Sequence, residues 1–374
     1  MVGAGLLGLA AAWAMSRRGW DTVVFEAAGA PGHDRSGSKG GARVFRLGYP
    51  DPFYVEMALL SRAAWRDLET ATGDRLLNVT GQLTFGDELG AVERALHSSG
   101  VATERLSPAE CARRFPGIDP GGPVLFEPDS GVLAADRCLD ALRVAGSFRL
   151  RTVAGIAALE DDDTEKVMLV LTGGESHEAD IVVNCAGHRA LSLLAGGSHT
   201  AVADGPSLPQ VAYFARHDPG APLPPVFIEW GREMLYGLPV PDAGGPHAGT
   251  YKLSHHTPGP PFDPADDSPF RDDPGLLNGL TTAAGRLLPA LDPAPVATER
   301  CVYDNSADTD FVLDRVGRVV VGCGTSGHAF KFGPLLGELL ADLAEDRTPA
   351  VDLSRFSLRR RPLPPDADVA PTPR

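Results

Sequence analysis

A glycine-rich turn at the start of the chain constrains the fold most. Residues 3–8 read Gly-Ala-Gly-Leu-Leu-Gly, an apolar helix-like segment follows to Arg18, and residues 22–26 read as a buried strand with an acidic end. Glycines in this order let backbone N–H groups approach a pyrophosphate at a helix N-terminus, and the carboxylate can accept a ribose hydroxyl. The sequence therefore predicts a dinucleotide site. Its cofactor-binding residues are Gly3, Gly5, Gly8 and Glu26.

The strand that should precede this turn is short in the sequence. A parallel sheet of this type needs about five or six apolar residues before the first glycine. Only Met1 and Val2 stand before Gly3. We expect the first strand to be missing and the natural protein to begin about six or more residues upstream with an apolar segment.

Composition excludes several classes of partner. The 374 residues carry 34 Lys and Arg against 49 Asp and Glu, a net charge of −15, which argues against nucleic acid because binding its phosphates requires clustered positive charge. No apolar run reaches the roughly 18 residues of a membrane-spanning helix. Five cysteines without metal-ligand spacing predict a reduced, cytoplasmic protein without a metal site. Lysine is rare, with Lys39, Lys166, Lys252 and Lys331 the only four.

Hydrophobic patterns predict an α/β fold built from separated segments. The chain starts as βαβ and ends with a strand near 319–322, a glycine-rich turn and a helix at 334–345. The material between is rich in strands, so we predict a nucleotide-binding domain that carries an inserted, sheet-based substrate domain. Further helices are expected at 53–72, 88–98, 136–147 and 276–288, a capping box at 107–110, a hairpin at 78–85, and strands near 210–216, 225–238 and 249–256.

A set of collinear motifs covers nearly the whole chain. They are Arg43-Val-Phe-Arg46, 125–133, 235–239, 250–256, Cys301-Val-Tyr303, 310–314 and 324–332. On these motifs the chain resembles the monomeric sarcosine oxidase family of flavoproteins, which includes N-methyltryptophan, pipecolate and nikkomycin-type imino acid oxidases.

The resemblance implies a particular domain arrangement. A Rossmann-like FAD-binding domain of the glutathione reductase type would comprise 1–77, 130–200 and 305–361. An inserted mixed-sheet α+β substrate domain would comprise 78–129 and 201–304. Residues 362–374 would form a disordered tail, and the protein would be a monomer.

The resemblance also implies roles at the flavin ring. Cys301 resembles the cysteine that joins FAD covalently, although a lone cysteine is more often a small buried hydrophobe. Lys252 resembles the lysine that activates O2, and Arg43 the arginine near the ring. The remaining cofactor-binding residues would be Gly324, Gly327, His328 and Lys331.

Substrate contacts are implied in the same way. Arg46 and Lys331 resemble the pair that clamps the substrate carboxylate, a role that suits a guanidinium fork and an ammonium. His256, four residues after Lys252 and therefore expected on the same strand face, resembles the histidine that contacts the substrate amine. Tyr236 and Tyr303 resemble aromatic walls of the pocket. Core packing or a solvated face is the alternative for each of these side chains.

Taken together, the resemblance implies an FAD-dependent oxidase of a secondary or cyclic amino acid that forms an imine and reduces O2 to H2O2. Three alternatives stay open: a dehydrogenase that passes electrons to another acceptor, a biosynthetic imino acid oxidase that oxidises its substrate repeatedly to an aromatic ring, and a flavin-binding protein without turnover. Ala42 and Ala329 depart from the family pattern of threonine and glycine, which leaves the substrate side-chain pocket unassigned.

Overall fold

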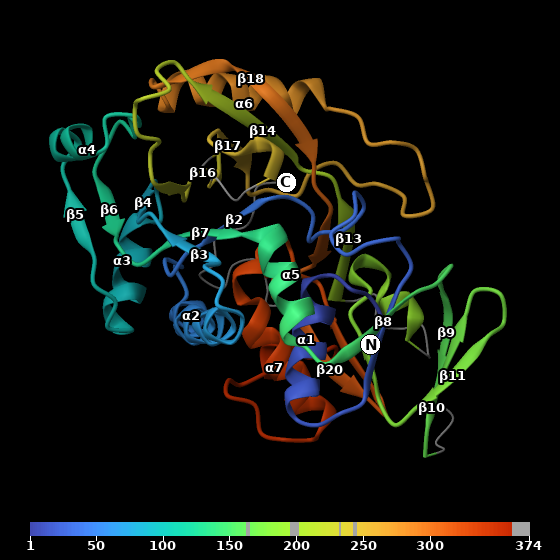
Figure 1. Cartoon of the computed structure of the whole chain (residues 1–374). Helices are drawn as coiled ribbons and strands as arrows, with labels where there is room; N and C mark the ends of the chain where they lie inside the picture. Colours follow the sequence, from blue (N-terminus) through green and yellow to red (C-terminus); the bar gives the residue numbers. More distant parts are fainter. Residues whose placement is uncertain (162–164, 195–201, 232, 242–244, 361–374) are drawn as a thin grey trace.

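The fold has two parts that meet at a central junction (Figure 1). The computed structural model describes residues 1–161, 165–194, 202–231, 233–241 and 245–360. Its α-helices are α1 (Leu6–Arg17), α2 (Pro52–Thr72), α3 (Leu89–Ser98), α4 (Pro108–Arg114), α5 (Ala135–Ala145), α6 (Pro274–Leu287) and α7 (Gly333–Ala344). Within these described ranges, none of the helices combines the length and apolarity that crossing a bilayer requires.

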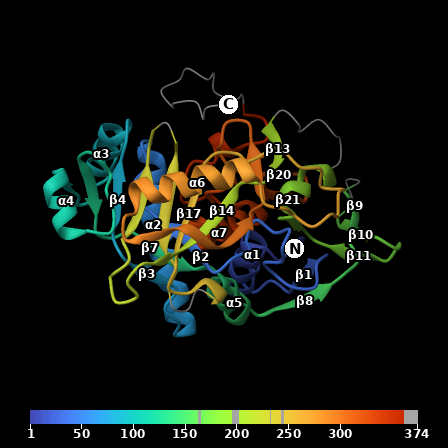
Figure 2. The ribbon, with the colours of Figure 1, turned by 90° about the horizontal axis from the view of Figure 1, so that it is seen from above.

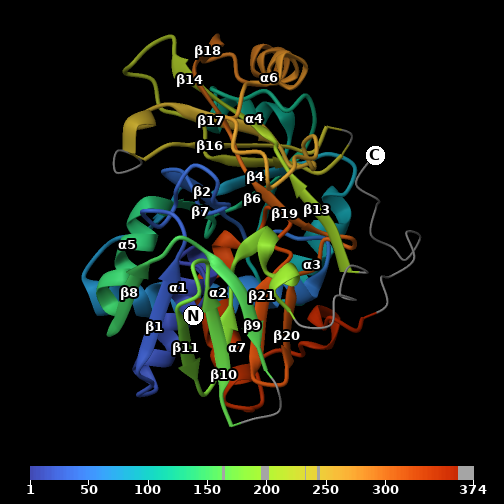
Figure 3. The ribbon, with the colours of Figure 1, turned by 90° about the vertical axis from the view of Figure 1, so that its right-hand side faces the viewer.

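The first part is built on a mostly parallel sheet. Its strands lie in the order β8 (Phe148–Thr152), β1 (Thr22–Glu26), β12 (Val182–Asn184), β21 (Val319–Cys323) and β20 (Val312–Val316), the last of them antiparallel. Helices α1, α2, α5 and α7 pack together on one face. The antiparallel sheet of β9 (Ile156–Glu160), β10 (Val167–Leu171) and β11 (Ser176–Ala179) packs near the other face (Figure 3).

Met1 and Val2 occupy the position of the first strand, between β1 and β12. The Val2 N–H donates to Val183 O over 2.9 Å, and the Phe25 N–H donates to Met1 O over 2.9 Å. Val2 is thus bridged to both neighbouring strands and joins the two halves of the sheet. The ladder that we expected to be missing is therefore present over two residues.

The second part is an eight-stranded mixed sheet. Its order is β18 (Leu291–Arg300), β14 (Gln210–Arg216), β17 (Tyr251–His255), β16 (Leu235–Pro239), β15 (Val226–Glu229), β4 (Gln82–Phe85), β6 (Val124–Glu127) and β5 (Glu104–Leu106). Helix α6 packs on its outer face, as seen from above in Figure 2. All eight strands fall within 78–129 and 201–304, and we propose these segments as the substrate domain.

The inner face of the large sheet points toward the junction. A small sheet of β2 (Ala42–Phe45), β7 (Gly131–Ala134) and β3 (Leu77–Val79) lies against this face, while β13 (Ala203–Ser207) pairs with β19 (Tyr303–Ser306). In the antiparallel register Tyr213 stands opposite Lys252, and Ile228 stands opposite Tyr236. Side chains from distant segments therefore converge beneath one sheet.

Two details differ from the sequence expectations. Residues 78–85 do not form a hairpin, because β3 pairs with β7 whereas β4 pairs with β6 and β15. The chain changes sheets at Gly81, which has a φ of +74° and passes so close to Phe126 that a Cβ would lie 2.5 Å from the ring. Strand β17 also ends at His255, so His256 follows the strand rather than lying within it. The predicted capping box at Ser107 and Glu110 is confirmed.

Close packing of α1 against α7 gives a test of this architecture. A Cβ at Gly337 would lie 2.4 Å from the backbone carbon of Ala10. We expect Gly337→Ala to lower the free energy of unfolding by about 1–3 kcal/mol, because backbone atoms must move apart.

Gly285→Ala is the matched control for this prediction. At Gly285, in the exposed face of α6, the nearest atom to a Cβ is 3.8 Å away. This substitution should stabilise the fold by about 0.5–1 kcal/mol through helix propensity. Urea denaturation measures both variants, and an equal or higher stability of Gly337→Ala would contradict the packing.

Candidate functional site

A cavity of about 1,200 Å³ runs from the start of α1 to the underside of the large sheet. This volume exceeds the roughly 300–1,000 Å³ of a typical small-molecule site, so the space suits an extended ligand. The cavity wall includes these predicted residues: Gly3, Gly5, Glu26, Arg43, Lys252, Cys301, Tyr236, Tyr303 and Gly327.

The glycine turn forms one end of this cavity. A Cβ at Gly3 would lie 2.6 Å from Cys185 O, and a Cβ at Gly8 would lie 1.9 Å from Gly3 O, so neither position accepts a side chain. Gly8 does not line the cavity; it allows the helix to approach the turn. The Glu26 carboxylate accepts hydrogen bonds from the N–H groups of Ala4 (2.7 Å) and Ala28 (2.9 Å).

The other end of the cavity carries a half-buried thiol and two cations. Arg43 donates to Ala42 O (3.1 Å) and also contacts the carbonyls of neighbouring loop residues. Lys252 is 2% exposed, and its Nζ donates to Ala42 O over 3.3 Å. Burial, reinforced by the charge of Arg43, lowers the pKa of Lys252 to about 8. Cys301 lies on the same wall with its thiol free.

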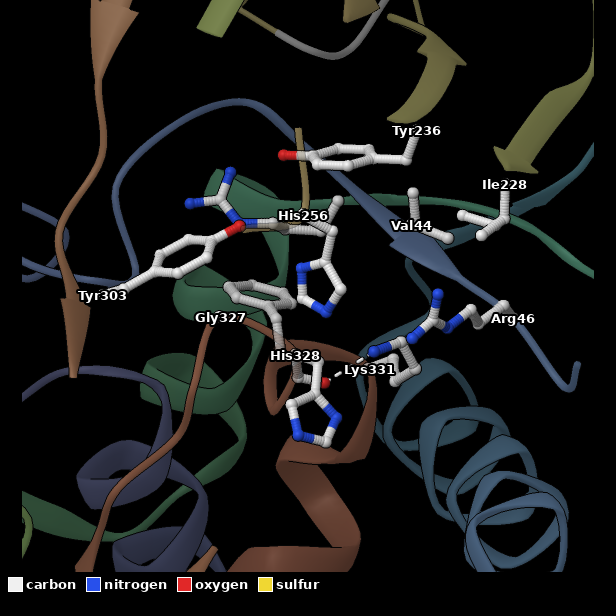
Figure 4. Close-up of a pocket in the computed structure, with 11 residues that line it drawn as sticks. Val44, Arg46, Ile228, Tyr236, His256, Tyr303, Gly327, His328 and Lys331 are labelled. Atoms are coloured by element: carbon white, nitrogen blue, oxygen red, sulfur yellow. Dashed lines mark hydrogen bonds between the residues drawn. The ribbon is translucent and has the colours of Figure 1, made fainter. Parts of the chain in front are cut away.

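A second cavity of about 50 Å³ adjoins the first (Figure 4). The two share part of their walls: Arg43, Tyr236, Tyr303, Gly327 and Phe330. Val44 and Ile228 form an apolar side, whereas Arg46, His256, His328 and Lys331 bring polar groups. Figure 4 shows Arg46 and Lys331 extending toward one another below His256.

Two buried cations define the chemistry of the small cavity. Arg46 is 4% exposed, and its guanidinium lies 4.2 Å from the Tyr49 ring and 4.7 Å from the Trp230 ring, while its Nε has no hydrogen-bond partner. Lys331 is 5% exposed and its Nζ donates to Tyr49 Oη over 2.9 Å. Neither cation forms an ion pair within the described ranges. Burial and the charge of Arg46 hold the pKa of Lys331 well below its ordinary value.

His256 faces these two cations. Burial, then the charges of Arg46 and Lys331, lowers the pKa of His256 to about 3, so its ring is neutral near pH 7. The ring lies 6.2 Å from Tyr303 and 6.3 Å from Tyr236, both edge-on. A neutral imidazole in this position can accept a hydrogen bond from a bound ammonium or amine.

Some predicted residues lie elsewhere than expected. Lys252 and His256, expected on one strand face, line different cavities. His328 and Lys331 line the small cavity and not the large one, and the His328 ring contacts Thr309 O (3.0 Å) and Tyr49 Oη (3.3 Å). Gly324 lines neither cavity; its N–H donates to Asp304 Oδ2 over 2.7 Å.

The sequence patterns missed several residues around the site. Ser38 Oγ accepts from the first N–H of α1 over 2.9 Å, in a loop whose Gly and Ser content could have revealed it. Glu127 lies close enough to Arg46 for their charges to interact. Burial raises the pKa of Glu127 to about 7, and its Oε2 has no hydrogen-bond partner. Tyr49 and Trp230 flank Arg46 without any motif spacing that would have signalled them.

The residues present fit FAD. A cradle without side chains at Gly3 and Gly5, next to the N-terminus of α1, suits a pyrophosphate. Glu26 lies on the wall at the same end, and the cavity continues without interruption to Cys301 and Tyr303. An extended dinucleotide would fit this cavity, with its pyrophosphate at the glycine turn and its other end next to the small cavity.

Comparisons with known proteins agree with this geometry. The chain is 32% identical to peroxisomal sarcosine oxidase from Homo sapiens, covering 97% of this chain and 95% of the relative. It is 27% identical to N-methyl-L-tryptophan oxidase from Yersinia pestis, covering 96% and 98%. The structure of NikD, an amino acid oxidase essential for nikkomycin biosynthesis, superimposes with a TM-score of 0.79 at 25% identity and 95% coverage of both chains. The DAO family profile, described as FAD dependent oxidoreductase, matches residues 1–343. The chain therefore belongs to the DAO family of FAD-dependent oxidoreductases.

Proposed function

We propose that this enzyme oxidises amino acids that carry a secondary or cyclic amine and reduces O2 to H2O2. One observation supports this most strongly: two buried cations and a neutral histidine line one small cavity that shares part of its wall with the FAD cavity. The names of the relatives, which include sarcosine and N-methyl-L-tryptophan oxidases, point to the same substrate class.

Arg46 and Lys331 bind the substrate carboxylate in this proposal. Burying these cations without an anion is unfavourable, so a carboxylate that pairs with both relieves the penalty. Tyr49 orients the Lys331 ammonium through its hydroxyl. The carboxylate thereby fixes one end of the substrate, and Val44 and Ile228 offer it an apolar wall.

His256 binds the substrate amine in this proposal. Because its ring is neutral, it accepts a hydrogen bond from the substrate nitrogen and thereby orients the amine. When bound, FAD would supply the acceptor for the electron pair that leaves with the hydrogen on the adjacent carbon and the route by which that pair reaches O2. Loss of two electrons and two protons converts the C–N bond into an imine, and O2 with two electrons and two protons gives H2O2.

A peroxide-coupled screen of amino acids tests this function. N-methyl and cyclic amino acids should give one H2O2 per imine formed, whereas the corresponding amines without a carboxylate should react at least about 100-fold more slowly. Substrate-dependent bleaching of FAD without peroxide under air would instead favour the dehydrogenase. The absence of any bleaching by these compounds would contradict the proposed substrate class.

We further propose that Cys301 joins FAD through a thioether. Its half-buried thiol lies on the cavity wall with Arg43 and Tyr303, and the other described cysteines are buried. We also propose that the enzyme is a monomer and that it works in the cytoplasm, a reducing compartment that suits its free thiols.

The Cys301 assignment makes a direct prediction. Acid precipitation of the wild type should leave FAD in the pellet, and Cys301→Ala should release it into the supernatant, because no thioether can form. Cys111→Ala, a buried cysteine outside both cavities, is the control and should keep its FAD in the pellet. Free FAD from the wild type would contradict covalent attachment.

Lys252 serves the oxygen step in this proposal, because a buried ammonium stabilises negative charge that develops on O2. Lys252→Met should slow reoxidation of FAD by about 100-fold or more and change substrate-driven reduction by less than about 10-fold. In the wild type, reoxidation should slow as the pH rises through about 8, where Lys252 loses its proton. Stopped-flow absorbance measures both half-reactions.

Lys166→Met is the control for this lysine. Lys166 forms an exposed ion pair with Asp180, and neither residue lines a cavity. Its loss should leave both half-reactions unchanged. Equal slowing of reduction and reoxidation in Lys252→Met would rule out a specific role in the oxygen step.

A further inference from the structure

A hydrogen-bonded trio of side chains lies beneath Lys252. Glu299, Tyr213 and His247 make up this trio and come from β18, β14 and the turn before β17. Tyr213 stands opposite Lys252 in the sheet register, and Glu299 stands opposite Val211, so these side chains share the inner face. The trio is not needed for the reaction steps described above.

The trio fixes one carboxylate firmly. The Tyr213 hydroxyl donates to Glu299 Oε2 over 2.7 Å, and His247 Nε2 lies 3.3 Å from Glu299 Oε1. The rings of Tyr213 and His247 stack with centroids 4.0 Å apart. Although burial opposes it, the Tyr213 hydrogen bond and the charge of Lys252 hold the pKa of Glu299 below its ordinary value. Glu299 is therefore an ionised carboxylate in a fixed position.

Lys252 lacks a direct anionic partner within the described ranges. Its Nζ donates to a backbone carbonyl and lies 5.8 Å from the centre of the Tyr213 ring. The face of the ring attracts the cation, and the hydroxyl at the edge of the ring holds the Glu299 carboxylate. At low effective dielectric, a fixed carboxylate on the same sheet face acts on a buried ammonium without direct contact.

Other charged groups surround Lys252 on the neighbouring elements. Arg43 on β2 opposes its charge, whereas Cys301 after β18, Glu299 on β18 and Asp136 on α5 favour it. Cys301 carries no charge once it is joined to FAD as proposed above, which leaves the two carboxylates. Lys39 and His247 lie near Glu299, and Lys39 is ion-paired with Asp34. Burial raises the pKa of Asp136, so Asp136 is the less effective counter-charge. Glu299 is thus the carboxylate best held in its ionised form.

We propose that Glu299, aligned by Tyr213 and His247, is the counter-charge that keeps the Lys252 ammonium protonated in its buried position. Glu299 acts through Lys252 and is a positioning residue. The inference rests on the proposed function only in assigning Lys252 to the oxygen step.

The scarcity of lysine allows a direct test. Protein loaded with FAD and labelled with [13Cε]lysine should give four lysine resonances, and Lys252→Met identifies the one of interest. In the wild type this resonance should titrate near pH 8. In Glu299→Gln, which keeps the size of the side chain, the midpoint should fall by about one pH unit. An unchanged midpoint in a folded variant would overturn the inference.

Two companion variants keep the test decisive. Tyr213→Phe preserves the ring but removes the hydroxyl that aligns Glu299, so it should lower the Lys252 midpoint by a smaller amount than Glu299→Gln does. An unchanged Lys252 midpoint in both Tyr213→Phe and Glu299→Gln would contradict the proposal. Asp136→Asn is the matched carboxylate control and should shift the midpoint less than Glu299→Gln does.

The oxygen step is read separately in the same proteins. FAD reoxidation in Glu299→Gln should equal the wild-type rate near pH 6 and should be about 5-fold slower than the wild type at pH 8, as the lowered midpoint requires. If the Lys252 midpoint falls in Glu299→Gln but the rate of FAD reoxidation at pH 8 does not, Glu299 is confirmed as the counter-charge. The proposed role of Lys252 in the oxygen step is then wrong.

Discussion

Burial of positive charge at one junction is the constraint on which this site depends. Arg46, Lys252 and Lys331 are each 5% exposed or less, in a chain whose net charge is −15. None of them forms an ion pair with a carboxylate in the part of the chain that the structure describes. An interior with unpaired cations favours whatever anion enters it, and this preference supports our proposals of a substrate carboxylate in the small cavity and of reduced oxygen near Lys252.

Three different elements of the fold carry these cations. Lys252 comes from the large sheet, Arg46 follows β2, and Lys331 lies in the turn that leads into α7. The turn is anchored because Ser61 and Trp65 of α2 both donate to Lys331 O, over 2.5 and 2.7 Å. Close packing of α7 against α1 then relates this turn to the dinucleotide end of the large cavity. The site is thus a product of the whole fold.

Local patterns in the sequence predicted much of this fold. The glycine turn, the helices and the capping box follow from periodicity and spacing, and they lie where expected. The sheet exchange at Gly81 could not be predicted, because it depends on the ring of Phe126 from a distant strand. Apart from the glycine turn and Glu26, the site residues were named through resemblance. Glu299 and Tyr213 escaped notice because cross-strand register, which is set by tertiary pairing, brings them together.

Arg46 and Lys331 hold the substrate carboxylate next to FAD in the mechanism that we propose. Anaerobic bleaching of the FAD absorbance by N-methylglycine tests it directly, with Arg46→Gln and Lys331→Met compared with the wild type. We expect the half-saturating concentration to rise by about 100-fold in each variant. N-methylethylamine, which lacks the carboxylate, should bleach FAD equally poorly in all three proteins. Unchanged half-saturation by N-methylglycine in both variants would rule out carboxylate binding by these two cations.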